Sequence, residues 1–181
     1  MSNYDINPFP STDNDRYAIW EMLVLRDIDA FLQQDWSMVA DDFIEAEFIG
    51  IHGQNTDNPD HWTLGYPDLG SYKAEWLRQA EAFAGEKFND DPREAIHYAT
   101  LLRDIEISGY RALVHKKFDG HITKADGTKD ILNWQTVYYC KKLNGRWKIT
   151  GFTGYLPNPM GVSKNMGFSN NMDQGKNPAE R

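Results

Sequence analysis

The stretch DILNWQTVYYCKKLNGRWKITGFTGY, residues 130–155, decides the fold of this 181-residue chain. It contains two runs rich in β-branched and aromatic residues, Asp130–Leu143 and Arg146–Tyr155, which meet at Asn144-Gly145. Asn-Gly between such runs is a strong hairpin signal, because both central residues of a type I′ turn need positive φ. The stretch therefore predicts two long antiparallel strands joined by a tight turn.

The same pattern continues toward the N-terminus. Two further β-branched or aromatic runs cover residues 95–107 and 110–123, and Ser108-Gly109 separates them. Asp126-Gly127 separates the second of these runs from the stretch quoted above. Three hairpin signals in sequence predict an antiparallel meander of four long strands.

The first half of the chain has helical periodicity. Ser11 or Thr12 is expected to cap a helix over about residues 13–33, in which apolar residues recur at helical spacing. Shorter segments follow, and the pattern predicts a helix at 36–43, a strand-like run at 46–52, a loop at 53–70 and a helix at 71–84. The sequence thus predicts helices first and a sheet afterwards.

One domain accounts for most of the length. Pro8 and Pro10 disfavour helix in residues 1–12, which are expected to form an extended arm. Residues 157–181 are rich in Pro, Gly and Asn and are expected to be a tail outside the core. The expected domain is therefore residues 13–156.

Composition excludes several classes of protein. The chain has 27 acidic and 19 basic residues, a net charge of −8, which argues against a nucleic-acid partner. Its single cysteine, Cys140, cannot form an internal disulfide. The start of the sequence does not resemble a secretory signal, and no apolar run approaches the ~18 residues that a membrane span needs. We therefore expect a cytoplasmic protein without a membrane partner.

If the hairpin loops have two residues each, they fix the strand register. Counting through Asn144-Gly145 and Asp126-Gly127 places His115 opposite Tyr138, on the same face as Trp134. The opposite face then carries the apolar residues Val137, Tyr139 and Phe152, together with Val114 and Phe118 of the preceding strand. With both faces apolar, the helices cover one and a second copy of the chain is expected to cover the other, as a homodimer. The alternative is that Met160, Met166 and Phe168 of the tail fold over it.

The order of elements resembles the nuclear transport factor 2-like superfamily, which includes SnoaL-like polyketide cyclases, ketosteroid isomerase and scytalone dehydratase. Three segments of residues 13–156 carry the resemblance: Ala30 with Asp35-Trp36, residues 110–114, and Gly-Arg-Trp-Lys-Ile at 145–149. The resemblance implies an α+β fold with a curved antiparallel sheet wrapped around N-terminal helices, a cone-shaped, cystatin-like α+β barrel. Superfamily members include enzymes, ligand binders and dimerisation modules, so the fold does not select a function.

The catalytic residues of ketosteroid isomerase are not matched. Asp27 stands where the isomerase has a tyrosine, and either Ile51 or Glu47 stands at the position of its aspartate base. Steroid isomerase activity is therefore not expected. Scytalone dehydratase is similar in chemistry, since Tyr and His side chains surround its pocket; here His52, His97, His115, Tyr17 and Tyr138 are available for such a set.

A pocket inside the cone is the expected site. We predict His115, Asp27 and Tyr138 as the catalytic group, because an imidazole beside a carboxylate takes up a proton near neutral pH. The expected ligand-binding residues are Tyr17, Trp20, Glu47, His52, Trp134 and Asp119. The simpler alternative for His115 is a hydrogen bond to Tyr138 within the core.

Two functions remain open on this sequence. The first is binding of a hydrophobic or aromatic small molecule, with cofactor-independent isomerisation, dehydration or cyclisation. The second is a non-catalytic homodimerisation or ligand-carrier module. No metal site or cofactor is expected, because the spacing of His52, Asp57, Asp60 and His61 fits no zinc or calcium template and no nucleotide-binding motif occurs.

Overall fold

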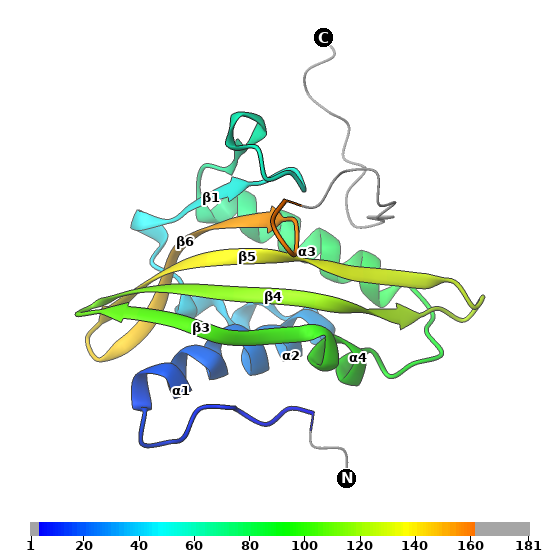
Figure 1. The fold of residues 1–181 in the computed structure, drawn as a ribbon, viewed down its shortest axis with the longest axis horizontal. Helices are drawn as coiled ribbons and strands as arrows, with labels where there is room; N and C mark the ends of the chain where they lie inside the picture. Colours follow the sequence, from blue (N-terminus) through cyan, green and yellow to red (C-terminus); the bar gives the residue numbers. More distant parts are fainter. Residues whose placement is uncertain (1–3, 162–181) are drawn as a thin grey trace.

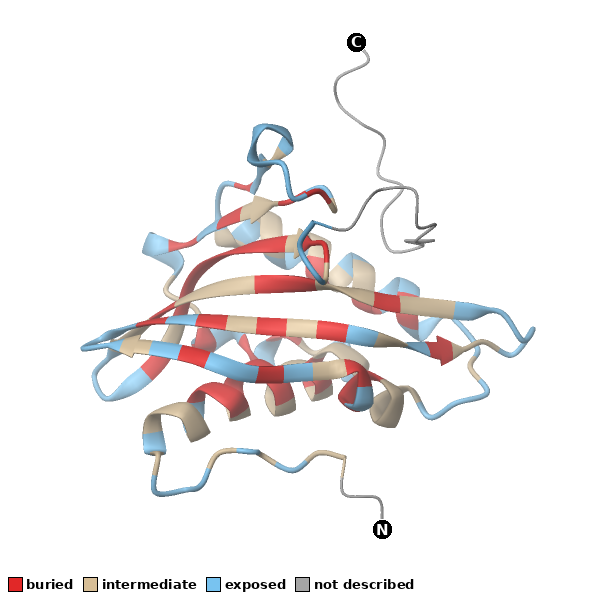
Figure 2. Ribbon diagram, in the orientation of Figure 1, coloured by how far each residue is buried: buried red, intermediate tan, exposed pale blue. Residues whose placement is uncertain are grey.

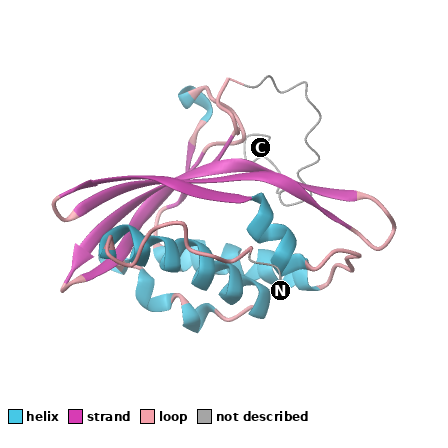
Figure 3. Cartoon of the chain, turned by 60° about the horizontal axis from the view of Figure 1, so that its bottom comes forward, coloured by secondary structure: helices cyan, strands magenta, loops and turns pink. Residues whose placement is uncertain are grey.

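The structure, a computed structural model, describes residues 4–161 (Figure 1). A six-stranded sheet in the order β2-β1-β6-β5-β4-β3 curves over one layer of helices. The long helices all lie on one side of the sheet (Figure 3). The expected α+β cone is confirmed, although the sheet is mixed, because β1 runs parallel to β6 and antiparallel to β2.

The helices precede the four long strands in the sequence, and the short strands β1 and β2 lie between η4 and α3. The helical elements are α1 (Asn14–Trp20), the π-helical segment η1 (Glu21–Arg26), α2 (Asp27–Gln33), α3 (Leu69–Ala84), α4 (Pro92–Ala99) and the 3₁₀ turns η2 (Trp36–Met38), η3 (Ala40–Asp42), η4 (Glu45–Glu47) and η5 (Pro59–His61). The strands are β1 (Ile49–His52), β2 (Thr63–Tyr66), β3 (Thr100–Ser108), β4 (Arg111–Thr123), β5 (Lys129–Leu143) and β6 (Arg146–Leu156).

The first helical stretch is continuous from Asn14 to Gln33 but changes its winding. Asp13 caps it by accepting a hydrogen bond from the Arg16 backbone N–H, so the expected cap at Ser11 or Thr12 is wrong. The π-helical segment η1 lies directly before Asp27. Wider winding rotates the residues that follow relative to a regular α-helix, and such segments are frequent at functional sites.

Several local predictions need correction. The region 36–43 forms two 3₁₀ turns instead of one helix, and the expected loop at 53–70 contains η5 and the edge strand β2. The run at 95–107 begins as the helix α4, which Asp91 caps and Pro92 opens. Proline at the first helical position after an acidic cap is a helix signal that the strand-like composition of this run obscured.

The β5–β6 hairpin keeps its predicted register only near the turn. Leu143 pairs with Arg146 and Cys140 with Ile149, as expected. A β-bulge then inserts one extra residue, so that Tyr138 pairs with Phe152. Phe152 therefore lies on the inner face and is 3 % exposed; its predicted place on the outer face is wrong.

The bulge coincides with the position where β1 joins the sheet. Gly151 has φ +154° and pairs with Ile49 of β1. A Cβ at this position would collide with the backbone carbonyl oxygen of Ile49. Glycine therefore permits both the irregular backbone and the close approach of the parallel strand.

The β4–β5 hairpin differs from its prediction by one residue. The Lys124 backbone N–H donates to the Thr128 carbonyl, which leaves a three-residue loop that ends in Gly127 at φ +84°. Three-residue hairpin loops with a left-handed final residue are common, and a one-residue slip exchanges the faces of a strand. His115 pairs with Val137 on the outer face, so its predicted position beside Tyr138 is wrong.

Buried and more exposed residues alternate along β4 (Figure 2). The residues on its inner face include a charged one, Lys116, which was not expected there. The inward residues of β4 are Ala112, Val114, Lys116, Phe118 and Ile122, each of them buried. Lys116 occupies the inner position that was predicted for its neighbour His115, and the predicted place of Val114 and Phe118 on the outer face is wrong for the same reason.

None of the long helices of residues 4–161 lies on the outer face of the sheet (Figure 3). Leu113 pairs with Tyr139, Tyr139 with Gly151, and Gly151 with Ile49, so these residues form one row across four strands. Leu113 and Ile49 are exposed. Of the tail residues proposed as an alternative cover, Met160 is exposed, and Met166 and Phe168 lie outside the described residues. None of the helices described between residues 4 and 161 is long and apolar enough to span a membrane.

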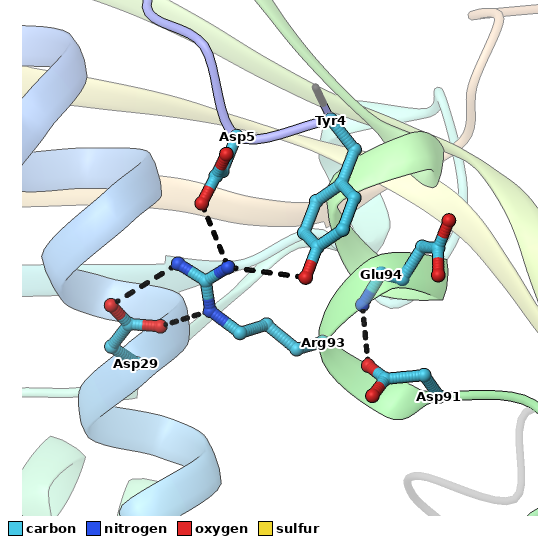
Figure 4. A network of polar contacts seen from close by, with 6 residues as sticks. All are labelled: Tyr4, Asp5, Asp29, Asp91, Arg93 and Glu94. Carbon is cyan, nitrogen blue, oxygen red and sulfur yellow. Dashed lines mark hydrogen bonds and ion pairs between the residues drawn. The ribbon is translucent and has the colours of Figure 1, made fainter. Parts of the chain in front are cut away.

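The segment before α1 is tied to the helical layer by Arg93 of α4 (Figure 4). Its guanidinium donates to the Asp5 carboxylate at 2.9 Å, the Tyr4 hydroxyl at 3.3 Å and the Asp29 carboxylate at 2.7 Å. The Tyr4 ring packs against His97, with 5.5 Å between ring centroids. His97 is 5 % exposed, and its Nε2 has no hydrogen-bond partner within the described residues.

His97 makes the stability of the fold depend on pH. Burial, reinforced by the charge of Arg93, lowers the pKa of His97 below its ordinary value of 6.5, while Asp5 and Asp29 oppose the shift. As the pH falls from 6.5 toward the lower pKa of the folded state, His97 binds a proton in the unfolded chain but not in the folded chain. The free energy of unfolding therefore falls as the pH falls through this range. Urea unfolding at about pH 7.5 and about pH 5.5 should show a smaller loss in His97→Phe than in the unmodified chain. The exposed His121→Phe serves as the control, and an equal loss in all three proteins would contradict the assignment.

Candidate functional site

A cavity of about 120 Å³ lies between the helices α2 and α3 and the inner face of β4, β5 and β6. Its walls are mostly aromatic, and the polar groups on them are few. The lining residues are Asp27, Ile28, Phe31, Tyr72, Trp76, Gln79, Phe83, Ile96, Lys116, Phe118, Leu132, Trp134, Thr136, Tyr138, Phe152 and Tyr155. An apolar concavity with a small number of convergent polar groups is the usual form of a small-molecule site.

Lys116 provides the amine of the cavity. It lies in the middle of β4, between Val114 and Phe118 in the inward phase of the strand, and it is 2 % exposed. Its Nζ lies 5.3 Å from the centroid of the Phe118 ring. A lysine this deeply buried is rare unless its charge is paired.

Asp27 supplies that pairing from the opposite side. It is the first residue of α2, and its Oδ2 accepts a hydrogen bond from Lys116 Nζ at 2.7 Å. The Asp27 side chain is 30 % exposed, whereas the lysine amine is enclosed. These two are the only charged side chains on the described wall of the cavity, so its net charge is zero.

The phenols of Tyr72 and Tyr138 add hydroxyl groups to the polar part of the wall, which also includes Gln79 and Thr136. Burial raises the pKa of both Tyr72 and Tyr138 well above the usual value of 10.0, and the negative charge of Asp27 adds to the shift at each of them. Both hydroxyls therefore stay protonated and can donate a hydrogen bond. Within residues 4–161, neither hydroxyl makes a hydrogen bond to another side chain or to the backbone, and both keep access to the space of the cavity.

The aromatic wall is held by ring contacts between elements. Phe118 of β4 stacks on Trp134 of β5 with 4.4 Å between centroids, and Tyr72 of α3 packs edge-on against Phe152 of β6 at 4.9 Å. Phe31 of α2 contacts Trp76 of α3 at 5.7 Å. Because these contacts join both helices to the sheet, the wall is formed by rigid elements and not by loops.

One side of the cavity ends at Tyr155. A second bulge in β6 precedes this residue, which has φ +55°, and the bulge turns its ring toward the inner face. Its hydroxyl accepts a hydrogen bond from Gln79 Nε2 at 3.0 Å. The His52 ring stacks on the Tyr155 ring with 4.2 Å between centroids, so His52 supports the wall from behind it and does not line the cavity.

The structure brings together three of the predicted site residues: Asp27, Tyr138 and Trp134 all line the cavity. His115 faces the opposite side of the sheet, and so does Asp119, which is exposed and accepts a hydrogen bond from Asn133. A place for these two in the pocket is therefore wrong.

Three other predicted ligand-binding residues lie elsewhere. Trp20 is part of the buried core, and the backbone carbonyl of Tyr17 accepts a hydrogen bond from the Asn7 side chain. Glu47, on η4, forms ion pairs with Lys141 and Arg111. None of these three lines the cavity, so their predicted positions are wrong.

Sequence reasoning missed Lys116 and the contribution of α3. A signal for Lys116 was present, because it stands in phase with Ala112, Val114 and Phe118 in a strand that alternates in polarity. The aromatic residues of α3, Tyr72 and Trp76, recur at helical spacing, but nothing local shows which part of the sheet that helix covers.

Other chemistries find no support at this site. Within residues 4–161, no three His, Cys, Asp or Glu side chains cluster in a way that would hold a metal ion. Burial raises the pKa of the Cys140 thiol to about 12, so it stays protonated at neutral pH and is a poor nucleophile.

The fold has counterparts among solved structures. The chain is similar to a nuclear transport factor 2-like superfamily protein from Salmonella enterica, at 14% identity and a TM-score of 0.53, over 87% of this chain and 99% of that one. It is also similar to an NTF-2-like protein of unknown function from Silicibacter pomeroyi, at 12% identity and a TM-score of 0.51, over 81% and 98% of the two chains.

A third solved structure, from Nostoc punctiforme, is described as having a cystatin-like fold; it is 12% identical, with a TM-score of 0.51, over 81% of this chain and 93% of that one. No family model matches the sequence, and no curated protein matches it. The comparisons confirm the expected nuclear transport factor 2-like fold. At these identities they show the fold alone.

The pair formed by Lys116 and Asp27 should behave as a coupled unit. Asp27→Leu leaves a buried ammonium without its partner and should lower the free energy of unfolding by about 2 kcal/mol, below the range for a fully enclosed pair because Asp27 is partly exposed. Asp27→Leu combined with Lys116→Met should recover most of this loss, since an apolar pair of similar volume packs without a charge. Chemical denaturation measures both values.

The neighbouring pair of Lys117 and Asp104, 2.8 Å apart on the sheet surface, provides the control. Asp104→Leu should cost less than about 1 kcal/mol, because exposed ion pairs contribute little. Losses that simply add in the double variant of Asp27 and Lys116 would show that the two residues are not coupled.

Proposed function

We propose that this protein binds a small aromatic molecule that carries an oxygen atom in the cavity around Lys116 and transfers a proton with Asp27. The observation that supports this proposal is the ion pair between Asp27 and Lys116 inside an aromatic wall. The proposed reaction class is a cofactor-independent isomerisation, dehydration or cyclisation.

The size of the cavity limits the ligand. Drug-sized ligands occupy pockets of roughly 300–1,000 Å³, whereas an apolar cavity of about 150 Å³ accepts benzene. The volume of about 120 Å³ therefore suits a compound with a single ring and a short polar substituent. The stacked rings of Phe118 and Trp134 offer a flat, apolar surface for such a ring.

The polar groups suit a carbonyl compound that forms an enol. The protonated phenol of Tyr138 and the ammonium of Lys116 can donate to a carbonyl oxygen, where negative charge develops. The Asp27 carboxylate can then accept a proton from the adjacent carbon, as a general base. Asp27 and Tyr138 remain members of the proposed catalytic group, but Asp27 now takes the role of base that was expected of His115. Lys116 takes the inner position that was expected of His115.

Acetophenone tests binding and proton transfer separately. It should raise the melting temperature of the protein and exchange its methyl protons for deuterium in heavy water, as followed by NMR. Asp27→Asn should reduce the rate of exchange by about a hundredfold or more, because a positioned base contributes that much, while leaving a melting-temperature shift.

Asp119→Asn and His115→Ala, both on the outer face, should leave binding and exchange unchanged. Binding without Asp27-dependent exchange would favour the ligand-carrier alternative over an enzyme. No melting-temperature shift with acetophenone would contradict the proposed ligand class.

The outer face supports a second proposal, a homodimer. The row formed by Leu113, Tyr139 and Ile49 is continuous across four strands, and two of its three side chains are exposed. Val137 and Tyr139 stay in the proposed interface, and Phe152 leaves it. Contiguous exposed apolar groups on a sheet face favour self-association.

Leu113→Glu should convert the dimer to a monomer, because two copies of the row would then bring like charges together at an isologous interface. Sedimentation velocity measures the change. Ile6→Glu, at an exposed apolar residue on the segment before α1, is the control and should leave the dimer intact. A monomer in the unmodified protein at micromolar concentration would contradict the dimer.

A further inference from the structure

Lys116 is a primary amine held inside an aromatic cavity, next to a carboxylate. Among residues 4–161 it is the only buried lysine. We propose that Lys116 is a nucleophile that condenses with the carbonyl group of a small aromatic aldehyde or ketone to form an imine. The inference rests on the proposed function, since it requires the ligand to occupy the same cavity.

The surroundings of the amine suit a nucleophile. A lysine is a weak nucleophile while it holds its third proton, and removal from water is one of the means by which proteins activate it. Asp27 Oδ2, at 2.7 Å from Nζ, is positioned to take that proton.

The reaction balances with the groups present. The Lys116 ammonium gives one proton to the Asp27 carboxylate, and the Nζ lone pair forms a bond to the carbonyl carbon while the carbonyl π electrons move to oxygen. A second proton passes from nitrogen to that oxygen, which gives a neutral carbinolamine. The Asp27 carboxylic acid then protonates the hydroxyl group, water leaves, and the nitrogen lone pair forms the C=N bond. Nothing is oxidised or reduced, and the Asp27 carboxylate is restored.

The protonated imine has the same charge as the Lys116 ammonium that it replaces. The protonated imine carries the single positive charge that the ammonium carried, so the Asp27 carboxylate retains a cationic partner. The protonated Tyr138 phenol can donate to the carbonyl oxygen during the attack. The site therefore changes its covalent state without leaving a buried charge unpaired.

Reductive trapping tests the inference. The full-length protein is treated with benzaldehyde and sodium cyanoborohydride near neutral pH, which converts any imine to a stable benzylamine, and the modified lysines are identified by peptide mass spectrometry. Benzylation of Lys116 should be at least about tenfold faster than that of Lys117, the adjacent residue on the outer face, because the cavity holds the aldehyde beside the amine.

Two variants accompany the measurement. Lys116→Arg keeps the positive charge but lacks the reactive amine, so the fast phase of benzylation should disappear; Lys117→Arg should leave it unchanged. Prior benzyl alcohol, which has no carbonyl group, should slow the fast phase by occupying the cavity. Because the decisive rate is measured on the unmodified protein, a folding defect in Lys116→Arg would not affect it.

The outcomes separate this inference from the proposed function. A rate at Lys116 no greater than that at Lys117 overturns the inference, and a fast phase that persists in Lys116→Arg does so as well. The melting temperature of the unmodified protein is therefore also measured with benzyl alcohol. If benzyl alcohol raises it while the benzylation result overturns the imine, the proposed binding function stands without the imine. If it does not, the proposed ligand class fails together with the inference.

Discussion

A lysine amine enclosed by aromatic rings must be paired, and this requirement links the sheet to the helical layer. Lys116 lies in the middle of β4, and its partner Asp27 lies in the first turn of α2. Their contact at 2.7 Å sets the separation of strand and helix at this point. Since separating Lys116 from its partner costs about 2 kcal/mol, the two layers cannot slide past each other without loss of stability. The cavity is the space that this contact leaves beside it.

The fold could be predicted from the sequence to the extent that it rests on local signals. Turn residues at Ser108-Gly109, Asp126-Gly127 and Asn144-Gly145 identify the four long strands, and all three hairpins are present. Which residues of β4 face the cavity depends on the exact number of residues in each turn. One additional loop residue before β5 places Lys116 inside and His115 outside. The polarity alternation of β4, with Lys116 among apolar residues, carried this information independently of the turn.

Other parts of the site depend on contacts between distant segments. The bulge beside Gly151 occurs where β1 joins β6 as a parallel strand, and the bulge before Tyr155 places that ring against Gln79 of α3. Each bulge adds one residue to a strand and thereby exchanges the faces of everything beyond it. Gly151 permits such an insertion, but a glycine in a strand does not by itself show how many residues are inserted or which strand pairs beside it. This is why Phe152 was expected on the outer face although it belongs to the cavity wall.

The polar groups of the cavity also explain why a ligand with oxygen is favoured over a purely apolar one. The hydroxyls of Tyr72 and Tyr138 form no hydrogen bond to the described residues, but they keep access to solvent through the cavity. A ligand that closes this access without accepting their hydrogen bonds leaves buried donors unsatisfied, and each unsatisfied donor costs about 1–3 kcal/mol. An aromatic hydrocarbon would fill the space but leave both phenols unsatisfied. A carbonyl or hydroxyl oxygen would accept from one of them while its ring packs against Trp134. The two phenols therefore discriminate between ligands of the same size, and they do so at the position where Lys116 and Asp27 supply a nucleophile and a base.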